Sequence, residues 1–263
     1  IPADALILDL EDAVAPDAKP EARERVCAAA TSGLYGAKEI AIRANGIGTQ
    51  WHDDDIQAAA PAGPDAILVP KVESAEQVRD LVAKLAAAGA PEHTQLWAMI
   101  ETPRAILQAE EIAAAHERLT VIVMGTNDIV NETYGLHVAG RNPVVLSALS
   151  TTLIAARAAG KVVIDGVYND VRNEEGFAAE ATQGREMGFD GKTLIHPSQV
   201  DPCNEAFSPS EADIERATGL IEAFEAAAAS GAGVATYNNK LVEELHVRDA
   251  KRIIAFADAL ASR

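Results

Sequence analysis

The sequence is short of basic residues, and this imbalance limits what the protein can bind. Lysine and arginine number 22 against 40 aspartates and glutamates, which gives a formal net charge of −18. A surface this acidic repels phosphate backbones, so the composition argues against nucleic-acid binding. It also means that an anionic substrate needs a local cation, either a positioned arginine or a metal ion.

Cysteines and long apolar runs are also scarce. Cys27 and Cys203 lie far apart and form no metal-binding spacing, so we expect reduced thiols and no disulfide framework. No apolar run approaches the roughly 18 residues that cross a bilayer, and no signal peptide opens the sequence. The sequence therefore predicts a cytoplasmic protein without a membrane partner.

Short apolar runs alternate with alanine-rich helical patterns. Strands are predicted at Ala5–Leu10, Glu39–Ala44, Ala66–Val72, Leu96–Ile100, Leu119–Met124, Val162–Ile164 and Thr193–Ile195. Helices are predicted at about Pro20–Ser32, Trp51–Ala60, Ala75–Ala88, Arg104–Ala115, Pro143–Ala159 and Glu174–Met187. This alternation predicts βαβ units and a parallel sheet, and the continuous Val, Ile and Leu indicate strands covered on both faces.

Two α/β architectures fit this alternation. A doubly wound sheet would carry a glycine-rich first turn, but the first turn here is the acidic DLEDAVAPD. A TIM (β/α)₈ barrel has eight strands, and because a strand begins almost at Ile1, we expect the first βα unit to be missing from this chain. The sequence favours the barrel over residues 1–207, followed by a C-terminal helical extension or lid over residues 208–263.

Polar residues follow the predicted strands. They are Asp9, Glu11, Asp12, Arg43, Asn45, Lys71, Glu73, Glu101, Arg104, Asn127, Asp128, Asp165 and His196. In a parallel barrel the carboxyl ends of the strands carry the active site. Converging carboxylates repel one another unless a cation lies among them, and oxygen-only ligands indicate a hard cation. We therefore predict that Glu101 and Asp128 share a Mg²⁺.

Other interpretations of these residues remain open. A strand-terminal acid often caps the next helix, and each acid taken singly is better explained as a cap. Arg43 either pairs with Asp9 or Glu11, or holds a substrate carboxylate through its bidentate guanidinium, which the acidic composition favours. His196 is either an acid/base group or, as we favour, a core histidine that fixes the loop before Pro197.

The order of several motifs resembles that of a known family. LILDLEDAVAPDAK, AIRANG, LVPKVES, MIETPRAI, GTNDIV and DGKTLIHPSQV follow one another as in the citrate lyase β-subunit-like family of the HpcH/HpaI aldolase superfamily, which includes malyl-CoA and citramalyl-CoA lyases. The resemblance covers about residues 5–204. It implies a TIM barrel with an upstream first strand.

The resemblance also implies roles for particular residues. Glu101 and Asp128 would hold Mg²⁺ and, through it, the substrate, and Arg43 would bind and activate the substrate's oxygens. Glu11 and Asp12 would lie near the metal and its waters, Glu11 binding substrate and Asp12 acting in catalysis. We assign Lys71, at the end of the third strand, to substrate binding as well.

Two segments depart from the family pattern. The loop NETYGLHVAGRNP is longer and more polar than is usual there. In the extension, a Gly-Lys-Met-(Ile/Val)-Asp motif usually supplies an acid to a neighbouring subunit, and Asn239–Glu243 match it here. Glu243, one methylene longer than the family's Asp, is the candidate catalytic acid.

The resemblance leads to one main functional hypothesis and two alternatives. The main one is Mg²⁺-dependent C–C cleavage, or formation, of a malyl-CoA-type thioester, giving acetyl-CoA or propionyl-CoA and glyoxylate or a similar 2-oxo acid. The alternatives are a malyl-CoA thioesterase and a citrate lyase β-subunit that acts on a citryl-acyl-carrier protein.

A homo-oligomer, a trimer or hexamer, follows from the same resemblance. Apolar stripes at helical spacing in the extension support it: Ile214, Leu220, Ile221 and Phe224 in one helix, and Ile253, Ile254, Phe256, Ala257 and Leu260 in the last. These stripes are also explained if they cover their own barrel. The Gly231–Gly233 break would act as a hinge.

Overall fold

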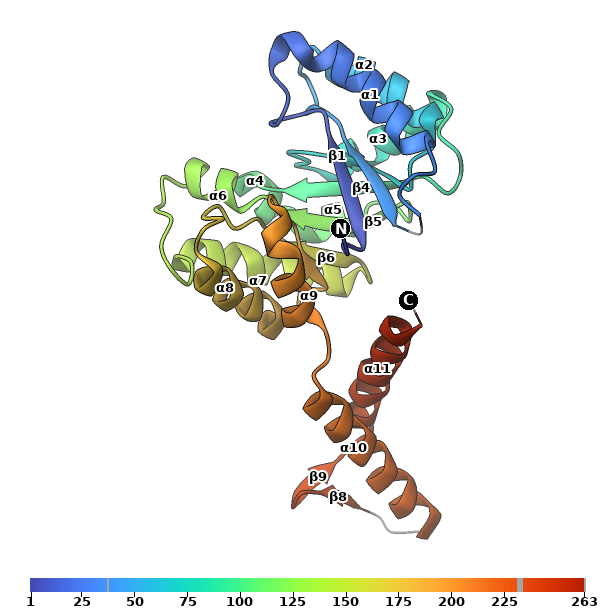
Figure 1. The fold of residues 1–263 in the computed structure, drawn as a ribbon, viewed down its shortest axis with the longest axis vertical. Helices are drawn as coiled ribbons and strands as arrows, with labels where there is room; N and C mark the ends of the chain where they lie inside the picture. The colour runs from blue at the N-terminus through green and yellow to red at the C-terminus, as the bar shows by residue number, and fades with distance from the viewer. Residues whose placement is uncertain (37, 231–233, 263) are drawn as a thin grey trace. The chain divides into compact units, whose positions relative to one another are not determined.

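Seven parallel strands form one curled sheet in the computed structural model, which describes residues 1–36, 38–230 and 234–262 (Figure 1). The strands are β1 (Ala5–Asp9), β2 (Glu39–Arg43), β3 (Ala66–Val69), β4 (Gln95–Ile100), β5 (Leu119–Met124), β6 (Val162–Asp165) and β7 (Gly191–Lys192). They follow one another in the sheet in chain order. A doubly wound sheet reverses its order, so this unbroken order is that of a TIM-like α/β barrel, as predicted.

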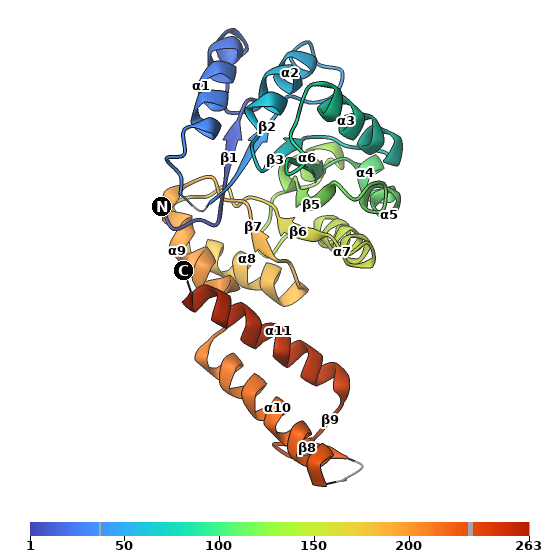
Figure 2. The same ribbon diagram turned by 90° about the vertical axis from the view of Figure 1, so that its right-hand side faces the viewer.

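Helices fill the connections between the strands. They are η1 (Pro16–Ala18), α1 (Lys19–Thr31), α2 (His52–Ala62), α3 (Ala75–Ala87), α4 (Pro103–Leu107), α5 (Ala109–Ala113), α6 (Thr126–Glu132), α7 (Pro143–Ala158), α8 (Glu174–Met187), η2 (Pro197–Gln199) and α9 (Val200–Phe207). Figure 2 shows α1, α2, α3, α7 and α8 around the outside of the curled strands. Because all the strands are parallel, their carboxyl ends lie at the same edge of the sheet.

The central strands, β3 to β5, are largely buried on both faces. One face carries a cluster of buried side chains from β2 to β5: Ala41, Ala66, Leu68, Trp97, Val121 and Val123. Residues that alternate with these, such as Ile67, Leu96 and Ile122, are completely buried as well and belong to the other face. Burial on both faces explains why the strands read as continuous apolar runs.

Two predicted elements differ from the structure, and one helix was not predicted. The last strand is Gly191–Lys192, because these residues pair with Ile164 and Asp165 of β6, and the prediction of Thr193–Ile195 was wrong. The helix predicted over Arg104–Ala115 is two short helices, since the backbone at Gln108 (φ −111°, ψ 11°) leaves the helical region. Helix α6 directly after β5 was missed, so Asp128 lies in the first turn of a helix.

The chain divides into two compact units, Ile1–Ala206 and Phe207–Arg263. The second unit consists of α10 (Glu211–Ser230), the antiparallel strands β8 (Ala235–Tyr237) and β9 (Lys240–Val242), and α11 (Glu244–Ala261). Ala235, Val242 and Val247 form its core, against which Leu220 and Phe224 of α10 pack.

The β8–β9 hairpin was missed from sequence. Its turn residues Asn238 and Asn239 have φ values of 48° and 60°, the left-handed conformation that a tight hairpin needs and that asparagine tolerates. The Asn-Asn pair between two short apolar segments was the available signal. The predicted Gly231–Gly233 hinge lies outside the described residues.

Both cysteines are free thiols, as predicted. Cys203 is buried, and burial raises the pKa of its thiol to about 11, which makes it a poor nucleophile. No helix in the described ranges combines the length and apolarity needed to span a membrane.

Candidate metal and substrate site

Arg43 and three acidic side chains form the first cluster at the carboxyl ends of the strands. Arg43 ends β2 beside Asp9, the last residue of β1, and binds it in bidentate fashion through Nε–Oδ1 (2.7 Å) and Nη2–Oδ2 (2.6 Å). Arg43 Nη1 also lies 2.6 Å from Glu11 Oε2 and 3.6 Å from Asp12 Oδ2. The pairing of Arg43 with Asp9 and Glu11 that the sequence allowed is therefore present.

The acids of this cluster titrate differently. Burial would raise the pKa of Asp9, but the hydrogen bonds from Arg43 and the backbone amides of Glu11 and Ala13 lower it below its usual value. Burial raises the pKa of Glu11; Arg43 opposes this, while the charges of nearby acids, Asp128 among them, add to it. Asp9 is thus the fixed partner of Arg43 and orders the turn at Glu11–Ala13 through its hydrogen bonds. The negative charge of Glu11 is less fully balanced by Arg43.

Glu101, which follows β4, is deeply buried at this edge, with an exposed fraction of 3%. It does not cap α4, because Thr102 does: Thr102 Oγ1 accepts the amide of Ala105 (3.1 Å) and donates to Glu73 Oε1 (2.7 Å). Burial and the charges of Asp128 and Glu11 raise the pKa of Glu101 to about 8. A buried carboxylate with acids as neighbours is stabilised by a cation.

Lys71 joins Glu101 to Asp128 in the second cluster. The amide of Lys71 donates to Glu101 Oε1 (2.9 Å), and its Nζ lies 3.0 Å from Asp128 Oδ1. The hydrogen bond to Asp128 raises the pKa of Lys71, against a smaller effect of partial burial. The backbone of Lys71 has a φ of 53°, a left-handed conformation that is strained for a lysine.

The two clusters offer oxygen ligands suited to a hard cation. Within the described residues, no group of three or more His, Cys, Asp or Glu side chains could hold a metal by itself. Mg²⁺ usually binds through one or two carboxylates and leaves its other positions to water and substrate. The charge of Asp128 raises the pKa of Glu101, so the two carboxylates repel each other, and a cation bound between them would relieve this repulsion.

Gly125, which follows β5, makes room for Glu101. A Cβ atom at this position would lie 2.2 Å from Glu101 Oε2 and 2.3 Å from Glu101 Cβ. Sequence reasoning missed this glycine, because only the fold brings residue 125 beside residue 101.

We therefore expect Gly125→Ala to push Glu101 out of position. Thermal melts with and without Mg²⁺ measure this, because a cation that binds only the folded state raises Tm. The Mg²⁺-dependent rise in Tm expected of the wild type should disappear in this variant, with a loss of about 1–3 kcal/mol in stability from overpacking. Gly191→Ala, whose added Cβ would meet only Ile164 Cδ1 at 3.6 Å, is the matched control. A full Mg²⁺ response in Gly125→Ala would contradict this role.

Asp165, predicted from a strand end, belongs to a separate buried cluster. Its Oδ2 lies 2.6 Å from Arg141 Nη2 and 3.0 Å from Lys192 Nζ. Glu180 Oε1 completes the cluster, 3.0 Å from Arg141 and 2.8 Å from Lys192. Two acids and two cations compensate one another, so this cluster anchors the loop that carries Arg141. The sequence pointed to Asp165 alone and missed its three partners, although an acid at a buried strand end needs a cation.

Four other strand-end residues are not joined to Glu101 or Asp128 by any hydrogen bond or ion pair within the described residues. Asn45 is buried and bonds Leu10 O and Asp55 Oδ2, and Glu73 accepts from Thr102. Arg104 is exposed on α4. His196 caps η2 through Ser198; it fixes this loop as expected, but it is exposed and the prediction of a core histidine was wrong.

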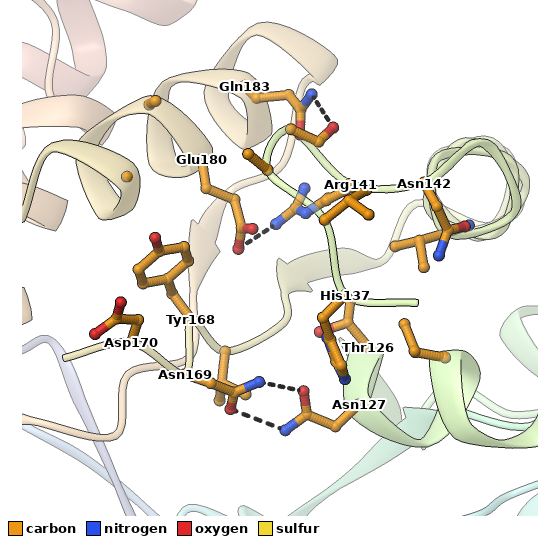
Figure 3. A pocket seen from close by; sticks show the side chains of 18 of the residues that line it. Thr126, Asn127, His137, Arg141, Asn142, Tyr168, Asn169, Asp170, Glu180 and Gln183 are labelled. Atoms are coloured by element: carbon orange, nitrogen blue, oxygen red, sulfur yellow. Dashed lines mark hydrogen bonds and ion pairs between the residues drawn. The ribbon is translucent and has the colours of Figure 1, made fainter. Parts of the chain in front are cut away.

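A cavity of about 570 Å³ lies between α6, α8 and the loop 134–142 (Figure 3). Asn127 forms part of its wall and exchanges two amide hydrogen bonds with Asn169 (3.0 and 2.7 Å). On the opposite side Arg141 reaches Glu180, and Gln183 Nε2 donates to Gly140 O (3.1 Å). The cavity thus shares α6 with Asp128, but the predicted site acids do not line it.

The structure is an α/β barrel with acidic side chains at the carboxyl ends of its strands, the edge at which enzymes of this fold carry their active sites. Residues 1–197 match the model of the HpcH/HpaI aldolase/citrate lyase family, and the chain belongs to this family. The resemblance read from the motifs is therefore confirmed.

Individual relatives cover nearly the whole chain. The (3S)-malyl-CoA thioesterase of Cereibacter sphaeroides (strain KD131) is 47% identical over 99% of this chain and 88% of the relative. The citrate lyase subunit beta of Escherichia coli (strain K12) is 37% identical over 98% of this chain and 86% of the relative. CitE of Mycobacterium tuberculosis, in a structure with magnesium, acetoacetate and coenzyme A, is 30% identical with a TM-score of 0.78, covering 97% of this chain and 90% of that one.

Proposed function

We propose that this protein hydrolyses a malyl-CoA-type thioester to malate and free CoA at a Mg²⁺ site formed by Glu101 and Asp128. The observation that carries the site is the pair of carboxylates held by one residue, Lys71, at the carboxyl ends of β3, β4 and β5. The relative named as a (3S)-malyl-CoA thioesterase, at 47% identity, supports the substrate class and the reaction. The magnesium in the CitE structure supports the metal.

The residues of the first cluster have distinct proposed roles. Arg43 would bind the substrate carboxylate, for which its planar guanidinium is suited. Asp9 keeps that guanidinium oriented, since it occupies both Nε and Nη2. Asp12, whose side chain is 76% exposed, is the proposed base that takes the proton of the attacking water. Bound Mg²⁺ would supply positive charge that polarises the substrate's oxygens.

The length of the Glu243 side chain and its place at a helix end favour hydrolysis over C–C cleavage. In the family pattern an Asp at this position serves as the acid, and here Glu243 is the N-cap of α11. It forms a capping box with His246, whose Nδ1 accepts the Glu243 amide (3.0 Å). Glu243 is also one methylene longer than the aspartate of the family pattern, so its carboxyl group would be placed differently as a proton donor to an enolate. Water attack on the thioester carbonyl needs no such donor.

C–C cleavage to acetyl-CoA and glyoxylate remains the second candidate, including the propionyl-CoA and other 2-oxo acid variants. It is favoured by the 37% identity to a citrate lyase subunit beta and uses the same proposed metal and arginine. In that reaction the substrate hydroxyl loses its proton, the bond to the acetyl-CoA carbon breaks, and the enolate takes a proton. Glu243 is the proposed donor for that last step.

Product analysis separates the two reactions. Purified protein with malyl-CoA and Mg²⁺ should release malate and one free thiol for each substrate consumed, with little glyoxylate. Glu243→Asp, which restores the length of the family's acid, should raise the share of glyoxylate if that length decides whether the enolate is protonated. Stoichiometric glyoxylate and acetyl-CoA from the unaltered protein would overturn hydrolysis in favour of cleavage. No turnover of malyl-, methylmalyl- or citramalyl-CoA would overturn both.

Two further predictions concern partners. An acyl-carrier protein could present the substrate in place of free CoA, since both carry the same arm; activity on free CoA esters by the protein alone would exclude that requirement. A homo-oligomer, with residues 208–263 of one subunit acting as a lid on the site of another, also remains a prediction, as does the cytoplasmic location.

A further inference from the structure

Lys71 makes polar contacts with both proposed metal ligands. Its amide donates to Glu101 Oε1 at 2.9 Å, and its ammonium lies 3.0 Å from Asp128 Oδ1. The side chain of Lys71 is 47% exposed and that of Asp128 is 31% exposed. The ammonium can therefore leave Asp128 for water without breaking a buried contact.

The backbone conformation of Lys71 shows that its amide and its ammonium have separate roles. At a φ of 53°, a glycine would hold the amide toward Glu101 without strain. A lysine in this conformation is less favourable by itself, and strain of this kind is found where a side chain has a functional task. The amide thus positions Glu101 whatever the side chain, and the ammonium is the part that a glycine would lack.

The ammonium and a divalent cation compete for the same carboxylate. Two positive charges a few ångströms apart repel each other strongly even near a protein surface. If the ammonium only held Asp128 in the orientation that binds a cation, it would have the opposite effect and strengthen cation binding. The sign of the change in cation affinity on removing the ammonium therefore distinguishes the two roles.

We propose that Lys71 is a positioning residue that acts as an exchangeable counter-cation: its amide fixes Glu101, and its ammonium must be displaced from Asp128 when a divalent cation binds. The displaced ammonium is then free to meet an anionic group of the substrate at the site mouth. This inference rests on the proposed metal site at Glu101 and Asp128.

Calorimetric titration with Mn²⁺ alone, at low ionic strength to limit screening, tests the proposal. Lys71→Met removes the ammonium and should bind Mn²⁺ about tenfold more tightly than the wild type. Lys71→Gly removes the ammonium and the strain, so it should match Lys71→Met in affinity and melt about 2–4 °C higher than Lys71→Met. Lys84→Met, which removes an exposed lysine paired with Asp53, is the matched control and should leave Mn²⁺ affinity unchanged.

The outcomes separate this proposal from the metal site itself. Unchanged or weaker Mn²⁺ binding in both Lys71 variants, with normal binding in the wild type, would overturn the counter-cation and leave the metal site standing. No Mn²⁺ binding by the wild type, or binding that Glu101→Gln does not weaken, would overturn the metal site and this proposal with it. Tighter binding in Lys84→Met as well would reduce the effect to general surface charge and would also overturn the proposal.

Discussion

Replacing Glu101 with glutamine is expected to lower turnover strongly and to stabilise the fold at alkaline pH. The proposed metal would lose one of its two carboxylates, and Lewis-acid stabilisation of several kcal/mol corresponds to a loss of roughly 10²–10⁴ in kcat/KM. Glutamine keeps the shape and can still accept the Lys71 amide. It removes only the charge that burial disfavours.

The pH dependence of this stabilisation follows from the raised pKa. In the folded protein the pKa of Glu101 is about 8, against a usual value of 4.5, so between these values the folded state binds more protons than the unfolded state. The stability of the wild type without metal should therefore fall by about 1.4 kcal/mol per pH unit across that window through this group. Below pH 4.5 Glu101 contributes no difference, and above pH 8 the loss is complete.

Chemical denaturation in EDTA at pH 5, 7 and 9 measures this directly. The free energy of unfolding of Glu101→Gln should exceed that of the wild type by an amount that grows with pH, on the order of 3–5 kcal/mol at pH 9. Glu110→Gln, on the exposed face of α5, is the matched control. A variant less stable than the wild type at every pH would mean that Glu101 is compensated by partners other than a bound cation.

Replacing Arg43 with lysine should lower kcat/KM by roughly 10²–10³-fold although the charge is kept. Lysine cannot reproduce the planar contacts that Arg43 makes to Asp9 and Glu11, and it would offer a substrate carboxylate one point of contact in place of two. Because Asp9 would lose its bidentate partner while largely buried, we also expect a loss of about 1–3 kcal/mol in stability.

Steady-state kinetics and thermal melts on matched arginine-to-lysine variants test this. Arg25, which forms an exposed pair with Glu21 on α1, provides a control in which Arg25→Lys should alter neither quantity. If Arg43→Lys lost stability but kept its kcat/KM, Arg43 would be only the structural partner of Asp9.

Much of the fold could be predicted because the periodic signals are strong. Six of the seven strands lie where the apolar runs placed them, since strands buried on both faces must be continuously apolar. The seventh, Gly191–Lys192, has no such signal: it is short, and its lysine is buried through ion pairs with Asp165 and Glu180. The hairpin and α6 were missed because they are short segments in which local turn geometry decides the structure.

The candidate site was only partly accessible from sequence. The carboxyl ends of parallel strands meet at one edge, so the positions of Arg43, Glu101 and Asp128 after predicted strands were enough to group them. The contacts that decide their chemistry could not be predicted. They are the left-handed backbone of Lys71, the space left by Gly125 and the cap that Thr102 supplies to α4, so that Glu101 is not needed as a cap. Each depends on residues brought together by the fold.

One measurement tests the central claim most directly: anomalous diffraction at the manganese edge from crystals soaked in Mn²⁺. The account predicts a single strong peak at roughly 2.1 Å from one carboxylate oxygen each of Glu101 and Asp128, the spacing that a small hard divalent cation requires. Asp9 should remain on Arg43. A peak held by Asp9, Glu11 or Asp12 without Glu101 and Asp128, or no peak at saturating Mn²⁺, would contradict it.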